Sequence, residues 1–253
     1  MEEEKKKPHR IYNLRFQPVD VKKVFFAAPP TALPLLVDLR DRMPPIYDQG
    51  NLGSCTGFAI CGAYSFLAKK PLKPSCLFQY YNERLLDGTV GYDAGSSIYQ
   101  SVQALEKFGV CGEKMWPYDI SKFTMQPPQP CYDNAKLNMV TQANQIAVDL
   151  QQMKRCLANG YPFVFGIVVF PSFESEEVGR TGIVPNPEAN EVSIGAHAMV
   201  VVGYDDAKQW FIVRNSWGTS WGGHGGYLFL PYSYLSNTQL CSDLWTIRKT
   251  SRN

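Results

Sequence analysis

The stretch Asp48–Lys70, DQGNLGSCTGFAICGAYSFLAKK, is the part of the sequence that decides the fold. Its first residues end in Gly53-Ser54, and from Cys55 onward apolar and small residues follow one another. This pattern predicts a helix over residues 55–69 that is buried on most of its sides. Cys55 would then lie at the helix N-terminus, where unpaired backbone amides and the positive end of the helix dipole favour a thiolate.

Further helices are expected in the first half of the chain, where serine caps, apolar residues at helical spacing and glycine stops recur. Ile98, Val102 and Leu105 are spaced i, i+4, i+7 and would share one helix face. Residues 116–133 contain four prolines and are expected to form a loop. The expected helices run from a Ser75 cap to about Leu86, from a Ser96 or Ser97 cap to Gly109, and over Ile146–Ala158 with Gly160 past its end.

The second half of the chain changes from helical to strand-like patterns. Phe163–Phe170 is a continuous run of apolar, β-branched and aromatic residues, and similar runs follow, separated by Gly, Asp and Asn turns. These runs predict an antiparallel sheet, and helices followed by strands predict an α+β fold with two lobes. The remaining expected strands are Ala198–Val202, Trp210–Arg214, Tyr227–Leu230 and Leu244–Ile247.

Composition restricts the classes of function. The chain has 253 residues, 45% of them hydrophobic, and a formal net charge of +2, which is too balanced to indicate a nucleic-acid partner. No apolar run approaches the length of a membrane span, and residues 1–16 lack the apolar core of a signal peptide. We therefore expect a monomer without a membrane or nucleic-acid partner. The compartment stays open: the protein could be intracellular, virion-associated, or processed from a precursor that carries a signal peptide.

Residues 1–33 are expected to form an N-terminal extension, followed by one catalytic domain over residues 34–253. The basic run Lys5–Lys7 lies beside Glu2–Glu4, as in a solvated tail. A short apolar run, Val24–Ala28, precedes Pro29-Pro30. Our hypothesis is that this run packs the extension along the domain and over its cleft as a short pro-segment; the alternatives are an edge strand or an unstructured end.

The cysteines and histidines offer little for a metal site. Seven cysteines occur without a CxxC pair, and there are only three histidines, so we expect no metal and no cofactor. The odd count leaves at least one thiol unpaired. Reduced thiols are the default without a signal peptide, although up to three disulfides stay open if one cysteine is catalytic.

Cys55, His197 and Asn215 together suggest nucleophilic catalysis. His197 opens an apolar strand and would be a structural residue if it stood alone, whereas next to a thiol it would act as a base. Asn215 ends another strand and could fix the tautomer of the imidazole, with Trp217 shielding that bond from water. Gln49 could donate its side-chain amide to an oxyanion together with the Cys55 backbone N–H.

Through these residues and the motifs around them, the sequence resembles the papain family of cysteine peptidases. Val37-Asp38-Leu39-Arg40 is similar to the mature start of that family, and the segment from Asp48 to Cys55 is similar to its oxyanion and nucleophile motif. Gly195-Ala196-His197-Ala198 resembles its histidine motif, and Arg214-Asn215-Ser216-Trp217-Gly218 resembles its asparagine block. The distances along the chain are 197 − 55 = 142 and 215 − 55 = 160 residues. In this family both partners lie about 130–150 residues after the cysteine, so Asn215 is slightly beyond that range.

The resemblance implies roles and a fold. It implies a helical N-terminal lobe and an antiparallel sheet or barrel C-terminal lobe, with the active site in the cleft between them. It assigns Cys55 as nucleophile, His197 as base and later acid, Asn215 as the residue that orients His197, and Gln49 as oxyanion donor. The substrate-binding residues that it implies are Gly53, Ser54, Ala94, Gly95, Ala196 and Trp217.

The departures from the family indicate a divergent member. Thr56 stands where a Trp usually follows the nucleophile, and Leu52 replaces a Cys of the usual disulfide. Ala94 replaces the first Gly of the substrate-binding pair, and the two-histidine loop of carboxydipeptidases is not seen. Such departures resemble bacterial and viral branches more than plant or lysosomal enzymes.

The resemblance implies a cysteine endopeptidase that acts on a peptide or protein substrate through an acyl-thioester, of the kind often made as a zymogen. The alternatives are a transpeptidase, deamidase or isopeptidase that uses the same triad, or a catalytically silent binding module. Specificity is open: Met199 and Leu244–Ile247 are candidates for the pocket walls, with a surface position as the alternative for each.

Overall fold

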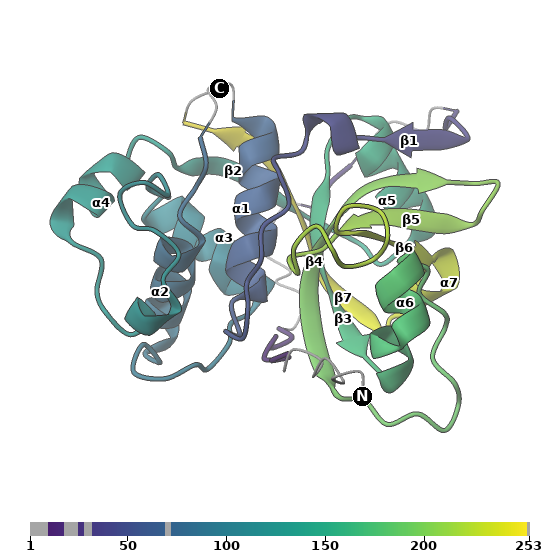
Figure 1. The fold of residues 1–253 in the computed structure, drawn as a ribbon. Coiled ribbons are helices and arrows are strands. Elements are labelled where there is room, and N and C mark those ends of the chain that lie inside the picture. The colour runs from purple at the N-terminus through teal and green to yellow at the C-terminus, as the bar shows by residue number, and fades with distance from the viewer. Residues whose placement is uncertain (1–9, 18–24, 28–31, 69–71, 252–253) are drawn as a thin grey trace, which may run out of the picture.

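The computed structural model describes residues 10–17, 25–27, 32–68 and 72–251. Two lobes lie side by side, with α1 to α4 on one side, most of the sheet and α5 to α7 on the other, and β4 along the boundary (Figure 1). The α+β, two-lobe prediction is therefore confirmed. Within the described residues, no helix is long and apolar enough to span a membrane.

Local capping explains the helices of the first lobe. Ser75 accepts a hydrogen bond from the backbone N–H of Phe78, and Gly88 ends the same helix at a φ of 69°. Ser97 accepts from the N–H of Gln100 in the same way. These are the expected starts and the expected stop. The helices of this lobe are α1 (Cys55–Leu67), α2 (Cys76–Asp87), α3 (Ile98–Lys107) and α4 (Gln129–Ala135).

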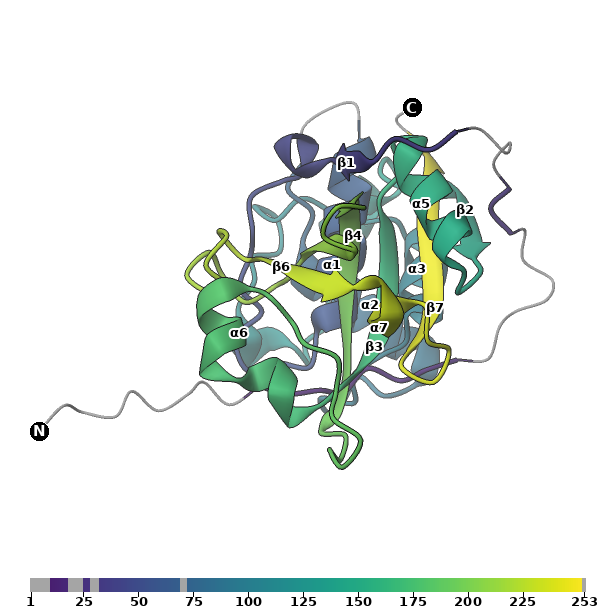
Figure 2. The same cartoon turned by 90° about the vertical axis from the view of Figure 1, so that its right-hand side faces the viewer.

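The second lobe is built on one antiparallel sheet with the strand order β2-β7-β3-β4-β5-β6, and β1 pairs with β4 outside this path. Figure 2 shows the long strand β7 on this path, between β2 and β3. The end strands β2 and β6 do not pair with each other, so over the described residues the sheet is open and the barrel alternative is wrong. The strands are β1 (Leu36–Asp38), β2 (Val140–Ile146), β3 (Phe163–Val169), β4 (Gly195–Asp205), β5 (Trp210–Arg214), β6 (Tyr227–Pro231) and β7 (Cys241–Thr250).

Two expectations for the middle of the chain are wrong. Ile146 ends the strand β2, and the helix α5 begins only at Leu150, because Asp149 caps it by accepting from the N–H of Gln152. The proline-rich loop contains α4, which is compatible with proline because Pro130 lies in its first turn, where no intrahelical partner is lost. Two short helices were also unforeseen, α6 (Glu176–Thr181) and α7 (Tyr232–Leu235).

The helix α1, which begins at Cys55, is packed against the sheet. Its residues are buried from Cys55 to Tyr64, as expected from the apolar pattern. One core cluster joins α1 with residues of β3, β4 and β7, among them Val164, Val200 and the fully buried Trp245. This shared core fixes the start of α1 relative to β4 and therefore positions the cleft.

The N-terminal extension contacts the domain in two places. Phe25 pairs with Gln145 of β2, and the N–H of Phe26 donates to the carbonyl of Gln145 at 2.7 Å, with the Phe26 side chain buried. Within Val24–Ala28, the described residues 25–27 thus lie on a sheet edge, and residues 24 and 28 lie outside the described residues. The segment Arg10–Gln17 is the part that lies in the cleft.

Candidate active site

We call the side of the cleft formed by the helical lobe the helical wall, and the side formed by β4, β5 and the residues after β5 the sheet wall. Cys55 lies on the helical wall, at the start of α1. The backbone N–H groups of Cys55, Thr56 and Ala198 face its sulfur. Because Ala198 follows His197 on β4, this contact brings the histidine strand against the start of the nucleophile helix. Cys55 has no exposed surface.

The Gln49 side chain is held from both walls. Its Nε2 donates to the carbonyl of Leu52 at 3.0 Å, and its Oε1 accepts from the Ser216 hydroxyl at 2.5 Å. The Tyr118 hydroxyl donates to the carbonyl of Gln49 at 2.8 Å and lies 2.7 Å from the Ser54 Oγ. The carboxamide therefore has a fixed orientation close to the loop that leads to Cys55.

The sheet wall brings His197 and Asn215 together. Val200 of β4 pairs with Arg214 of β5, so His197 on β4 and Asn215 directly after β5 lie near each other. His197 Nε2 is 2.9 Å from Asn215 Oδ1, and His197 Nδ1 has no hydrogen-bond partner although it is buried. Trp217 stacks on the imidazole at 4.9 Å between ring centroids, with an interplanar angle of 24°. The expected pair and its shielding Trp are thus in contact.

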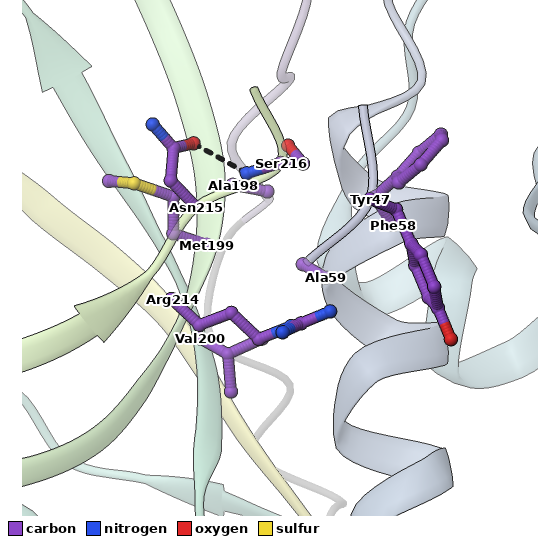
Figure 3. Close-up of a pocket in the computed structure, with 9 residues that line it drawn as sticks. All are labelled: Tyr47, Phe58, Ala59, Ala198, Met199, Val200, Arg214, Asn215 and Ser216. Atoms are coloured by element: carbon purple, nitrogen blue, oxygen red, sulfur yellow. Dashed lines mark hydrogen bonds between the residues drawn. The ribbon is translucent and has the colours of Figure 1, made fainter. Parts of the chain in front are cut away.

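Figure 3 shows a small pocket between α1 and strands β4 and β5, with Asn215 and Arg214 at the end of β5. The amide oxygen of Asn215 also accepts from the Ser216 N–H at 2.8 Å. Arg214 extends toward α1 and donates to the carbonyls of Pro44 and Pro45 at 2.7 and 2.5 Å. This arginine fixes the segment that leads to the oxyanion loop.

The segment Ala94-Gly95, which is expected to bind substrate, lies on the helical wall and is held by Asp93. The Asp93 carboxylate accepts from the Gly53 N–H at 2.9 Å and from the Tyr80 hydroxyl. The Tyr80 hydroxyl in turn accepts from the Gly95 N–H at 3.0 Å. Gly95 has a φ of 64°, and a Cβ there would lie 1.9 Å from the carbonyl oxygen of Asn13. A glycine is therefore required at position 95 by its backbone and by its neighbour, whereas Ala94 precedes this close approach.

The extension occupies the cleft at these same residues. The N–H of Leu14 donates to the carbonyl of Ala196 at 3.3 Å, and the N–H of Arg15 donates to the carbonyl of Ser96 at 2.9 Å. The Tyr12 ring packs edge-on at 6.0 Å from the His197 ring. The segment Arg10–Gln17 therefore covers the site between Ser96 on the helical wall and His197 on the sheet wall.

Burial makes both reactive groups neutral in this covered state. It lowers the pKa of His197 to about 4, although the Asn215 hydrogen bond acts in the opposite direction. Burial also raises the pKa of Cys55 to about 12, against the effect of the N–H of Ala198. Burial therefore favours the neutral thiol and imidazole over a thiolate–imidazolium pair while the cleft is covered.

The other sequence candidates fall in less reactive positions. Met199 is buried and lines the small pocket in Figure 3, and Leu244–Ile247 is buried in the core, so the surface alternative is wrong for both. All seven cysteines are free and buried. Within the described part of the chain, no group of three or more His, Cys, Asp or Glu side chains could hold a metal ion.

Several site residues were missed by the sequence. Asp93 and Ser216 act through hydrogen bonds to segments distant in the chain, so no local pattern identifies them. The covering segment had one signal, the alternation of Leu14 and Phe16 with polar residues, which is typical of an extended strand.

A cysteine at a helix N-terminus, facing a histidine–asparagine pair across two lobes, defines the class of two-lobe cysteine peptidases. The chain belongs to the papain family of cysteine proteases, whose model matches residues 33–241. It is 42% identical over 217 residues to an uncharacterized peptidase C1-like protein of Acanthamoeba polyphaga mimivirus, covering 81% of this chain and 70% of that protein.

Two further similarities agree with a divergent member of viral or bacterial type. The structure of xylellain, a cysteine protease from Xylella fastidiosa, is 38% identical with a TM-score of 0.85, covering 94% of this chain and 95% of that one. A cathepsin L-like peptidase of Aedes aegypti is only 27% identical over 206 residues, or 76% of this chain, and the chain spans 58% of its length.

Proposed function

We propose that the chain is a cysteine endopeptidase with Cys55 as nucleophile, His197 as base and then acid, and Asn215 as the residue that orients His197. The observation that carries this proposal is the unpartnered Nδ1 of His197. The other ring nitrogen is occupied by Asn215, which leaves Nδ1 free to take a proton, and the backbone of Ala198, the next residue on β4, contacts the Cys55 thiol.

The chemistry follows from these positions. The Cys55 sulfur, after losing its proton to His197, attacks the scissile carbonyl carbon, and the resulting oxyanion accepts hydrogen bonds from the Gln49 amide and the Cys55 N–H. Collapse breaks the C–N bond, and His197 gives its proton to the leaving amine, leaving an acyl-thioester. Water, deprotonated by His197, then cleaves the thioester and regenerates the thiol.

Peptide binding would use the residues that already bind the chain's own extension. Ala196 offers its carbonyl to Leu14, and Gly53 and Gly95 lack the side chains that would collide with Asn13. The same surfaces would accept an extended substrate backbone. Ser54 and Ala94 lie next to these glycines in the chain, and Trp217 stacks on His197.

Thiol labelling tests the nucleophile. A thiol-reactive epoxide peptide should label the wild-type protein once, at Cys55, and should not label Cys55→Ala. Cleavage of a peptide library should be lost in the same variant, whereas Cys241→Ala, which removes another buried thiol, should keep it. Absence of labelling in both the wild-type protein and a form that begins at Gln17, which lacks the covering residues, would contradict the proposal. A new peptide bond or ammonia from glutamine side chains would indicate a transpeptidase or deamidase.

We also propose that residues 1–33 are a pro-segment that blocks the cleft of a catalytic domain over residues 34–253. Residues 10–16 supply the block, and the buried Phe26 anchors the extension to β2. A form that begins at Gln17 keeps the anchor and should cleave peptides faster than the full-length chain. A form that begins at Arg10 keeps the block and serves as control. Equal rates for all three would exclude autoinhibition.

A further inference from the structure

We propose that the cleft contains a subsite for a basic side chain on the leaving-group side of the scissile bond, formed by Trp217 and Glu174. The preferred substrates would then carry Arg or Lys shortly after the bond that is cut. This inference rests on the proposed endopeptidase activity and specifies the substrates of the same site.

The chain's own Arg10 occupies this subsite. Its guanidinium carbon lies 3.8 Å from the centroid of the Trp217 ring, and its Nε lies 4.0 Å from Glu174 Oε1. The Arg10 side chain is only 14% exposed, so water does little to solvate its charge. An aromatic face together with a carboxylate is an arrangement that stabilises a desolvated cation. Arg10 therefore stands in for a substrate side chain.

Two cavities adjoin this contact, of about 140 and about 620 Å³. Trp217, Trp221 and Gly179 line both of them. Of the described residues that line the cavities, Arg10 is the single cation, whereas Glu174, Glu176 and Asp48 carry negative charge. Once Arg10 leaves with the extension, the charges of these walls favour an incoming basic group over an acidic one.

The order of contacts along the extension shows which side of the scissile bond this is. Arg15 and Leu14 bind Ser96 and Ala196, in the segments proposed to accept a substrate backbone, and we assign these segments to the acyl part of the substrate. Tyr12 lies at His197, and Arg10 lies beyond it, on Trp217. Because His197 must protonate the leaving amine, the groups past His197 belong to the leaving-group side.

Glu174 is the residue that distinguishes this subsite from a merely aromatic one. Among the described residues of the extension, Arg10 contacts Glu174 and the Tyr12 hydroxyl donates to its carboxylate. Departure of the extension removes these two contacts. A substrate cation stacked on Trp217 would restore the first of them.

The test uses the full-length chain and internally quenched peptides that share one cleavage site. They differ only in the first, or separately the second, residue after the cut, which is Arg, its neutral isostere citrulline, or Glu. We expect kcat/KM for Arg to exceed that for citrulline by about tenfold at one of these positions, with Glu lowest. Since the extension competes equally with every peptide, the ratio does not depend on how often the cleft is open.

Variants assign the preference to the carboxylate. Glu174→Gln should reduce the ratio of Arg to citrulline to about twofold, because the aromatic face alone remains. Glu188→Gln removes the same charge from an exposed loop position and should leave the ratio unchanged. Equal cleavage of Arg and citrulline peptides by the wild type at both positions would overturn the subsite, even if the Glu174 variant failed to fold. Failure of both the full-length chain and the form that begins at Gln17 to cleave any peptide would instead refute the proposed activity.

Discussion

On the sheet wall of the cleft, His197 lies on β4 and Asn215 directly follows β5, the strand paired with β4, whereas on the helical wall Cys55 begins α1 and Gln49 and Gly95 come from separate loops. The pairing of β4 with β5 brings the backbones of the two sheet residues together through main-chain hydrogen bonds. The loops of the helical wall are joined instead through side chains, among them Asp93 between Gly53 and Tyr80.

This difference teaches that side-chain substitutions should act differently on the two walls. The sheet wall should keep its backbone after any substitution of a catalytic side chain, so the loss would be purely chemical. The helical wall should lose alignment when a supporting side chain is removed, even one that touches no substrate. Ser216 contributes to both, since it lies on the sheet wall and holds Gln49 of the other.

The largest effect is expected from Asn215→Ala on the sheet wall. Without the acceptor at 2.9 Å, the imidazole loses the bond that fixes its tautomer and its ring orientation. We expect kcat/KM for a peptide to fall about 100-fold, together with a melting temperature lowered by a few degrees, because the buried Ser216 N–H also loses its acceptor. Asn190→Ala, in an exposed loop, is the matched control and should be silent. An unchanged kcat/KM would mean that the ladder and the Trp217 stack hold His197 unaided.

The next effect concerns the extension, which keeps the titratable groups of both walls neutral. The pKa of His197 is about 4 in the covered state, below the ordinary value of 6.5, so the covered state binds fewer protons than the open one between these values. Lowering the pH therefore favours opening. Arg10 acts in the same direction because it repels an imidazolium. Tyr12, Cys55 and the Glu174 carboxylate that contacts Arg10 and Tyr12 are other titratable groups nearby.

In the wild type the open-state imidazole can take its proton from Cys55, which leaves the proton count of the site unchanged. The measurement is therefore made in a Cys55→Ala background, as the affinity of the full-length chain for a peptide substrate divided by that of the form that begins at Gln17. Because both forms share the same site residues, their ratio cancels the pH dependence of peptide binding itself. We expect this ratio to rise roughly tenfold between about pH 7 and about pH 5. A ratio that is constant over this range would show that His197 keeps its ordinary pKa beneath the extension.

The elements that carry the proposed catalytic residues were largely predictable from the sequence, because their signals are local. A glycine and serine before an apolar run predict the start of α1, and the run after His197 predicts β4. The spacing of Cys55, His197 and Asn215 added the family resemblance. Their roles remain predictions, because only labelling and kinetics can test them.

The parts that failed depend on partners distant in the chain. The strand β2 carries polar residues such as Gln142 and Asn144, and it is a strand because β7 pairs with it. The Arg10–Gln17 segment extends through the cleft because Ala196 and Ser96 offer backbone partners, which no local pattern reveals. The resemblance suggested a pro-segment but not which residues contact the site.

On the helical wall, Asp93→Asn should have a moderate effect. The carboxylate accepts from the Gly53 N–H and from the Tyr80 hydroxyl, and an amide nitrogen cannot accept from either. We expect kcat/KM to fall about fivefold through misalignment of the loops that carry Cys55 and Gly95. Asp133→Asn, exposed on α4, removes an equivalent charge and is the control. An effect as large as that of Asn215→Ala would erase the proposed difference between the walls.

The smallest effect is expected from Ser216→Ala, which removes the contact between the walls. Gln49 would lose the hydroxyl that holds its Oε1, while its Nε2 would keep the carbonyl of Leu52. A less firmly oriented amide stabilises the oxyanion less, and the oxyanion exists only beyond the ground state. We therefore expect kcat to fall about threefold with KM unchanged. Ser233→Ala, on the exposed face of α7, should change neither constant. A rise in KM at constant kcat would place Ser216 in substrate binding, and the two walls would then be coupled through the substrate instead of through Gln49.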